Sequence, residues 1–274
     1  MKPPPFTYHA PRDLPAALRT LAEVGGKVLA GGQSLIPMLN MRLAAPGHVV
    51  DINRVAGLDG IEVSRAGVTV GALARHADVE RAGAHPLLTW ALKLVAHPAI
   101  RNRGTVVGSL VHADPAAELP AVLAVLGGHV RVARWDCGRV TFREIPAAEF
   151  FVGPMESAVG PGELAVSAFF PALEEGSGAA FHEVSRRHGD YALAGACAVV
   201  GVAGARVACI GVGGGPVVID VGGDLSSAAA RVRDAVDPDD DIHASAAYRR
   251  HLVGVLAERA LRDAAREGAA ARGA

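Results

Sequence analysis

Two glycine-bearing loops carry the residue types best suited to binding an anion. The first is Ala30-Gly31-Gly32-Gln33-Ser34, and the second, about 75 residues later, is Thr105-Val106-Val107-Gly108-Ser109. Each follows an apolar run that predicts a strand, and each leads into a helical pattern. Glycine lets backbone N–H groups approach a ligand closely, and the N–H groups that open a helix favour negative charge. Two such loops, each with a hydroxyl side chain at its exit, predict one large diphosphate ligand held from both sides.

Other cofactor and catalytic motifs do not fit. Gly211-Val212-Gly213-Gly214-Gly215-Pro216 has proline where a dinucleotide fingerprint needs its last glycine, and a strand-like run follows instead of a helix. His182-Glu183 is followed by His188, which is too far along for a zinc-protease helix. The sequence has no P-loop motif, no G-x-S-x-G elbow and no four clustered cysteines. We therefore predict no metal ligand and no catalytic nucleophile in this chain.

Composition and charge indicate a reduced protein of the cytoplasm. The 27 basic and 28 acidic residues nearly balance and form no long run of one sign, which disfavours nucleic-acid binding. The first residues lack the apolar core of a signal peptide, and no uncharged apolar stretch is long enough for a transmembrane segment. The cysteines Cys137, Cys197 and Cys209 leave an odd one over and form no C-x-x-C pair, so we expect free thiols.

Hydrophobic periodicity and turn residues predict mixed helices and strands before residue 174. The predicted helices are 12–24, 76–83, 87–95 and one that begins near Ala117. The predicted strands are 27–30, 49–52, a hairpin of 61–63 with 68–70, and a hairpin over 129–142. Ser34 is the expected N-cap of a helix after the first loop, and Asp114-Pro115 is expected to form a turn.

Composition shifts at Glu174 to Gly178, which is the best candidate for a domain boundary. Strand-like runs follow at 179–187, 193–202, 206–212 and 216–221, separated by short glycine turns. Two helical patterns, 226–236 and 245–267, finish the chain. The pattern predicts an antiparallel meander covered by helices, and an α+β fold for the whole chain.

Four sequence blocks together resemble one known family. They are AGGQSLIPMLNMRLAAPGHVVDINRV (30–55), IRNRGTVVGSLVHADPAAELP (100–120), SRRHGDYALAGA (185–196) and YRRHLVGVLAERAL (248–261). In order and spacing they resemble the FAD-binding medium subunit of the molybdenum hydroxylases, the carbon monoxide dehydrogenase medium-chain group related to the flavin domain of xanthine dehydrogenase. The resemblance implies a vanillyl-alcohol-oxidase/MurB-like FAD-binding domain over 1–174, with subdomains of approximately 1–56 and 57–174. A C-terminal domain of antiparallel sheet and helices would span 175–274.

The resemblance also implies which residues contact FAD. The two loops would hold the diphosphate, Glu118 would lie near the flavin, and Asp190 with Tyr191 would approach its isoalloxazine ring. The implied cofactor contacts are Lys27, Ala30, Gly31, Gly32, Gln33, Ser34, Leu35, Thr105, Val106, Val107, Gly108, Ser109, Asp114, Glu118, Asp190 and Tyr191. Some relatives in the wider fold attach flavin through a histidine or cysteine of the first loop. Gln33 stands in that loop here, so we expect non-covalent FAD.

Val107 departs from the family pattern, which usually has glycine at this position of the second loop. If the position needs a positive φ or a close approach to phosphate, a β-branched side chain there is strained by about 1–3 kcal/mol. On that interpretation Val107→Gly should tighten FAD binding.

The function that the resemblance implies is electron transfer within a larger assembly. A molybdopterin-binding large subunit would oxidise the substrate, and a 2Fe-2S small subunit would pass electrons to the FAD of this chain. NAD, quinone or oxygen would be the external acceptor. Two alternatives remain open, namely a stand-alone flavoprotein oxidoreductase and a family member that has lost FAD and acts as a non-redox binding protein.

Overall fold

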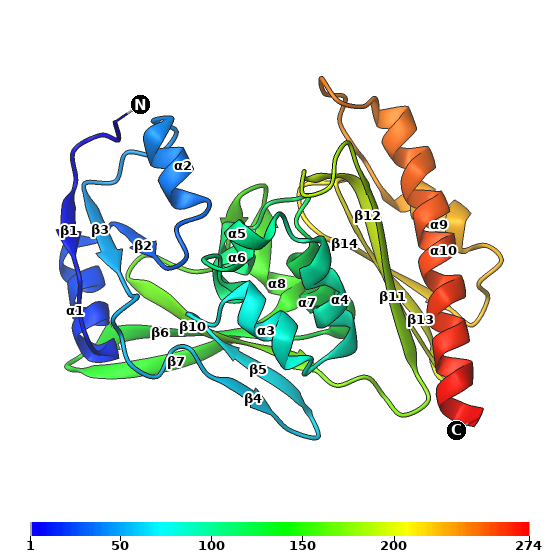
Figure 1. Cartoon of the computed structure of the whole chain (residues 1–274), viewed down its shortest axis with the longest axis horizontal. Helices are drawn as coiled ribbons and strands as arrows, with labels where there is room; N and C mark the ends of the chain where they lie inside the picture. Colours follow the sequence, from blue (N-terminus) through cyan, green and yellow to red (C-terminus); the bar gives the residue numbers. More distant parts are fainter. Residues whose placement is uncertain (1, 274) are drawn as a thin grey trace.

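The computed structural model describes residues 2–273, and the strands in this part of the chain form separate sheets arranged along the long axis of the molecule (Figure 1). A small parallel sheet with helices α1 and α2 lies at one end. A mixed region of helices over an antiparallel sheet lies in the middle. A second antiparallel sheet, covered by the long helix α10, lies at the other end. Secondary structure is thus mixed in the order that an α+β fold requires, as the sequence predicted.

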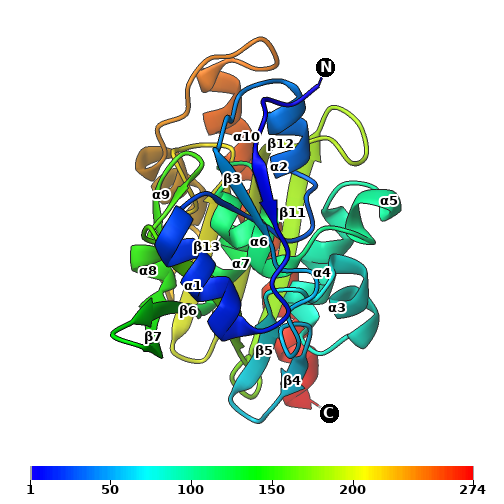
Figure 2. The same cartoon turned by 90° about the vertical axis from the view of Figure 1, so that its left-hand side faces the viewer.

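The N-terminal sheet is parallel, with strand order β1-β3-β2. Its elements are β1 (Thr7–His9), α1 (Leu14–Val24), β2 (Lys27–Leu29), α2 (Leu35–Asn40) and β3 (His48–Asp51). The side chain of Asp13 caps α1 by accepting the N–H of Ala16 at 2.7 Å, and Leu18 and Leu21 on one helix face are buried. Figure 2 shows α1 and this sheet from the front. The sheet delivers the first glycine loop at the end of β2.

The middle sheet is antiparallel, with order β4-β5-β10-β6-β7. Its strands are β4 (Ile61–Val63), β5 (Gly67–Gly71), β6 (His129–Asp136), β7 (Arg139–Pro146) and β10 (Glu163–Pro171), and a separate short pair is β8 (Phe151–Gly153) with β9 (Glu156–Ser157). Both predicted hairpins are present in it. The central strand β10, which pairs with β5 and β6, was not anticipated, although the turn Gly160-Pro161-Gly162 stands directly before it.

Short helices connect the strands of the middle region. They are α3 (His76–Ala82), α4 (Pro86–Leu94), α5 (Pro98–Arg101), α6 (Val106–His112), α7 (Glu118–Leu126) and α8 (Ala147–Phe150). Helix α7 is buried along nearly its whole length, since each of residues 118–125 is buried. It contacts β10 of the middle sheet and β12, β13 and β14 of the last sheet, and so joins the two regions.

The last sheet is the predicted antiparallel meander, with order β11-β12-β13-β14. Its elements are β11 (Gly178–Ser185), β12 (Ala192–Gly201), β13 (Gly204–Ile210), β14 (Val217–Gly222), α9 (Ala228–Ala235) and α10 (Ala246–Gly273). Helix α10 packs on β11 and β12 (Figure 1). None of the helices in residues 2–273 has the length and hydropathy that a bilayer-spanning helix needs.

The chain before the second glycine loop is not a strand, and that expectation was wrong. Pro98 begins the short helix α5, and residues 102–104 lead from it to Thr105. Thr105 then forms an isolated antiparallel bridge with Arg75. Proline at the first helical position stabilises such a turn, because its fixed φ suits a helix and its missing N–H costs nothing there.

The strain expected at Val107 is also absent. Residues 106–112 form α6, so Val107 lies in the first turn of a helix, and its side chain is only 2% exposed in the core. The non-glycine residues with positive φ in the described chain are Arg42, Ala96, Ala113, Cys137 and Met155. The position that excludes a side chain is Gly108, because a Cβ there would lie 2.5 Å from Oγ1 of Thr105. That hydroxyl caps the helix by accepting the N–H of Gly108 at 3.1 Å.

The helical position of Val107 predicts that Val107→Gly lowers the free energy of unfolding by about 3 kcal/mol. The change would remove a buried side chain and place glycine inside a helix. Urea unfolding of the FAD-free chain measures this loss. An FAD titration of the same variant should show no tightening, and tighter binding would restore the strain interpretation.

Candidate functional site

The two glycine loops lie side by side, in backbone contact. A Cβ on Gly31 would stand 2.5 Å from the carbonyl oxygen of Arg103 and 2.8 Å from Cα of Gly104. Gly31 therefore serves the contact between the loops. Its neighbour Gly32 has a φ of +74°, which glycine adopts without strain, and this turns the chain into α2. The structure thus brings loop 1 (30–34) and loop 2 (105–109) together.

A polar network, here named the loop clamp, fastens the loops to each other. It consists of Asp51, Asn53 and Arg75. Nδ2 of Asn53 donates to the carbonyl of Ala30 in loop 1 at 2.8 Å. Arg75 donates from Nη2 to Oδ1 of Asn53 at 2.6 Å and from Nη1 to the carbonyl of Arg103, just before loop 2, at 2.7 Å. The clamp therefore bonds to the backbone of both loop segments.

Asp51 orients the side chain of Asn53 within the clamp. Its Oδ1 accepts both the backbone N–H of Asn53 at 2.8 Å and the Asn53 side chain at 2.6 Å, and its Oδ2 accepts the Tyr8 hydroxyl at 2.6 Å. Burial alone would raise the pKa of Asp51, but the hydrogen bonds from Tyr8 and Asn53 outweigh it and lower that pKa. Asp51 is therefore ionised at neutral pH and fixes the direction of the Asn53 amide.

Unpaired backbone donors remain at the loops. The N–H groups of residues 32–35 in loop 1 and at the start of α2 have no acceptor among residues 2–273, and neither does the N–H of Val107. Successive free N–H groups at a glycine turn and a helix start form a concave donor set that suits an anion. The residues present therefore fit the diphosphate of FAD. The side chains of Val106 and Val107 are buried, and the N–H of Val106 donates to the carbonyl of Ala74, so of these two residues only the N–H of Val107 is available to it.

The hydroxyls at the loop exits have different surroundings. Ser34 stands at the N-cap of α2, but its side chain makes no capping hydrogen bond. Ser109 Oγ lies 3.0 Å from Nε2 of His76, a residue only 3% exposed. Burial lowers the pKa of His76 to about 4, so its ring is neutral at pH 7. Sequence reasoning missed His76, Asn53 and Arg75, although Asn53 follows the predicted strand 49–52 inside a matching block.

A second group of candidate residues gathers buried carboxylates. Asp114 and Glu118 are 9% and 8% exposed, and Glu183 on β11 has a buried Oε2 without a hydrogen-bond partner among the described residues. Burial, and then the neighbouring Glu183, raises the pKa of Glu118 to about 8, while burial raises the pKa of Glu183 to about 7. Glu118 is therefore largely protonated at neutral pH. The sequence interpretation did not include Glu183 among the cofactor contacts. Glu183 was considered only with His182 and His188, whose spacing does not fit a zinc site.

Tyr191 lies beside these acidic groups at the molecular surface. Desolvation, followed by the charges of Asp114 and Glu118, raises the pKa of its hydroxyl. Its side chain is among the exposed aromatic ones, so a face is available to a planar ligand. The structure thus brings Asp114, Glu118 and Tyr191 together, as a shared flavin-facing edge would require.

Two further candidate residues, Lys27 and Asp190, lie neither at the glycine loops nor among the buried carboxylates. Lys27 is exposed at the start of β2, at the opposite end of the strand from loop 1. Asp190 pairs with Arg186 at 3.6 Å. The turn that carries Asp190 packs on another loop, because a Cβ on Gly189 would stand 2.6 Å from the ring of His97.

The raised pKa of Glu118 predicts a pH-dependent stability. The folded chain holds a proton that the unfolded chain releases above about pH 4.5, so the free energy of unfolding falls as pH rises from 4.5 towards 8. Each such group contributes a slope of up to about 1.4 kcal/mol per pH unit. Urea unfolding of the FAD-free chain at several pH values measures the slope. Glu118→Gln should flatten it, whereas the exposed control Glu175→Gln should not, and equal slopes in the wild-type chain and both variants would contradict a proton held by Glu118 in the folded state.

Comparison with known proteins identifies the family. Residues 4–173 match the family model described as the FAD binding domain in molybdopterin dehydrogenase. The chain is 41% identical to the 6-hydroxypseudooxynicotine dehydrogenase complex subunit alpha of Paenarthrobacter nicotinovorans, with 96% of each chain covered. It is 34% identical to the carbon monoxide dehydrogenase medium chain of Hydrogenophaga pseudoflava, over 96% of this chain and 98% of the relative.

The fold agrees with the sequence comparison. The structure superposes on reconstituted CO dehydrogenase from Oligotropha carboxidovorans with a TM-score of 0.90 and 29% identity, covering 97% of this chain and 99% of the other. Family match, full-length identity and fold therefore lead to one conclusion. The chain belongs to the family of FAD-binding domains in molybdopterin dehydrogenases and is an FAD-binding oxidoreductase subunit.

Proposed function

We propose that this chain is the electron-transfer subunit of a molybdenum hydroxylase, passing electrons from an iron–sulfur subunit to an external acceptor. The observation that carries the proposal is the pair of glycine loops, held side by side with free N–H groups. The family match adds FAD, and the names of the relatives, "complex subunit alpha" and "medium chain", add membership of a larger assembly.

In this proposal each group of residues has a distinct task toward FAD. The free amides of residues 32–35 and of Val107 bind the diphosphate. Ser34 and Ser109 lie beside them, and the loop clamp keeps both loops in place. Tyr191 offers its exposed ring, and protonated Glu118 keeps a neutral carboxylic acid near it. Loop 1 carries Gln33 and no histidine or cysteine, so the cofactor is held non-covalently.

FAD, when bound, exchanges one electron at a time with iron–sulfur clusters and one or two with other acceptors. The protein contributes orientation and local charge, which set the potential of the ring. A molybdopterin-binding large subunit and a 2Fe-2S small subunit are the partners that we propose, with NAD, quinone or oxygen as the final acceptor.

Of the two competing functions, only the loss of FAD is weakened by the structure. Loss of FAD was motivated by strain at Val107, and that residue is an ordinary buried position of α6. A stand-alone flavoprotein oxidoreductase would turn over a small substrate without partner subunits, which separates it from the electron-transfer subunit.

The proposal predicts that the purified chain binds FAD and shows the flavin absorption bands, and that trichloroacetic acid releases the flavin into the supernatant. The full chain should be mixed with FAD, freed of excess by gel filtration and scanned in the visible range. A colourless protein that ignores added FAD would overturn the proposal. Substrate turnover by the isolated chain would support the stand-alone alternative.

The loop clamp predicts that Asn53→Ala weakens FAD binding about tenfold, since the change removes hydrogen bonds to Ala30 and from Arg75 that position the loops. Quenching of flavin fluorescence measures the dissociation constant. Asn102→Ala is the matched control, because Asn102 is exposed, lies just before loop 2 and makes no side-chain hydrogen bond among those described. Equal affinities of the two variants would show that the clamp does not position the loops.

A further inference from the structure

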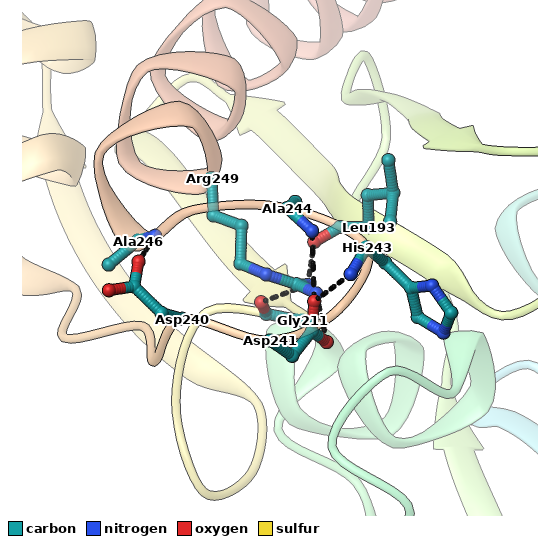
Figure 3. A network of polar contacts seen from close by, with 8 residues as sticks. All are labelled: Leu193, Gly211, Asp240, Asp241, His243, Ala244, Ala246 and Arg249. Carbon is teal, nitrogen blue, oxygen red and sulfur yellow. Dashed lines mark hydrogen bonds and ion pairs between the residues drawn. The ribbon is translucent and has the colours of Figure 1, made fainter.

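Arg249 is the buried charged residue of the block YRRHLVGVLAERAL, which the FAD site described above does not use. It lies in the first turn of α10 and is only 7% exposed. Its Nη1 donates to the carbonyls of Leu193 at 2.5 Å and Gly211 at 3.2 Å, and its Nη2 pairs with Asp241 at 2.6 Å (Figure 3). One guanidinium therefore bonds to two backbone segments of the last sheet.

Both of these carbonyls belong to segments that lead directly to the flavin-facing edge. Leu193 follows Tyr191 by two residues, at the start of β12. Gly211 follows β13, and its N–H donates to the carbonyl of Pro115 at 2.9 Å, beside Asp114. The guanidinium is thus one hydrogen bond away from the Tyr191 segment and two away from the Asp114 segment.

The two segments also contact each other. Gly211 has a φ of +71°, and a Cβ there would stand 2.8 Å from the carbonyl oxygen of Leu193. A side chain at this position would push apart the two carbonyls that Arg249 draws together. The close approach leaves both carbonyl oxygens aimed at the same guanidinium, as Figure 3 shows.

The segment before α10 is built to hold this guanidinium. Oδ1 of Asp241 accepts the N–H groups of His243 at 2.8 Å and Ala244 at 2.9 Å, while Oδ2 faces Arg249. These hydrogen bonds, and then Arg249, lower the pKa of Asp241 to about 2, so its carboxylate stays charged. Asp240 accepts the N–H of Ala246 at 2.5 Å, which caps the start of α10.

We propose that Arg249 is a positioning residue for the FAD site, which ties the Tyr191 and Asp114 segments to α10 and so fixes the edge that faces the flavin ring. The proposal rests on the proposed function only for the identity of the ligand at that edge. The C-terminal region then does more than cover the cofactor domain. It sets the geometry of Tyr191, which belongs to the C-terminal region, and of Asp114, which belongs to the cofactor domain.

The test compares Arg249→Lys and Asp241→Asn with the control Arg250→Ala in the full chain. Lysine keeps the charge but cannot reach both carbonyls and Asp241 together, and asparagine removes the charge that orients the guanidinium. Arg250 is the matched control, because it is the next residue along α10 and its side chain finds its polar partners, within the described chain, in the carbonyl of Val236 and in Asp237.

The first readout needs no FAD. In the FAD-free chain, amide hydrogen exchange at residues 191–194 and 211–215 should be about tenfold faster in both variants than in Arg250→Ala, because these segments lose their tie to α10. Exchange in loops 1 and 2 should stay unchanged. Exchange equal to that of the control in both variants overturns the proposal, whatever the chain binds.

The second readout uses FAD. The two variants should bind it about tenfold more weakly and show altered visible circular dichroism of the bound flavin, a signature that lost stability alone does not produce. Unchanged affinity and dichroism in a chain that binds FAD overturn the positioning role. A wild-type chain that fails to bind FAD overturns the proposed function instead, and the exchange measurement still decides whether Arg249 ties the segments.

Discussion

The contact between Gly31 and the backbone of residues 103–105 is the constraint on which the site depends. It allows the loop that follows β2 and the loop that lies between α5 and α6 to approach each other closely. A backbone contact of this kind provides little binding energy for an anion by itself, and it leaves the loops free to slide past one another. The loop clamp removes that freedom, because Asn53 and Arg75 bond to carbonyls on opposite sides of the contact.

Both groups of candidate residues contain polar groups in a state that is unfavourable without a ligand. At the loops, the N–H groups of residues 32–35 and of Val107 have no acceptor in the described part of the chain, which our proposal of phosphate binding requires. At the edge that we propose faces the flavin, Glu118 is buried and holds a proton at neutral pH, because burial and the neighbouring Glu183 raise its pKa to about 8. Leaving polar groups unsatisfied or holding a proton in a buried site is unfavourable for folding. Binding sites are where such costs are expected, since the ligand relieves them.

Much of the fold could be predicted because the deciding signals are local. Glycine turns separate the strands of the meander, and the hairpin at Asp136-Cys137-Gly138 marks its own turn. The parallel sheet and the central position of β10 could not be predicted, because strand order depends on contacts between residues far apart in sequence. The division at 174 and 175 stays a prediction, although the sheet does change between Pro171 and Gly178.

The site followed the same rule. The glycine loops and their joint hold on one ligand were predicted from the residues of the loops themselves, but the clamp residues come from separate segments and have no shared motif. Val107 was misinterpreted because the motif position was treated as a loop with unusual φ, whereas the helix begins one residue earlier. Glu183 was overlooked because a carboxylate on a strand gives no sign of its burial until the covering helix is known.

Helix α7 has a further consequence for how this protein can be taken apart. It belongs to the first 174 residues, yet it contacts the middle sheet and the meander at once and is buried along nearly its whole length. A fragment ending at residue 174 would expose to water the leucine and valine side chains of α7 that pack on the last sheet. An exposed apolar surface of this kind favours aggregation. The two regions are separate in topology but share one interior, because the buried helix α7 belongs to the packing of both.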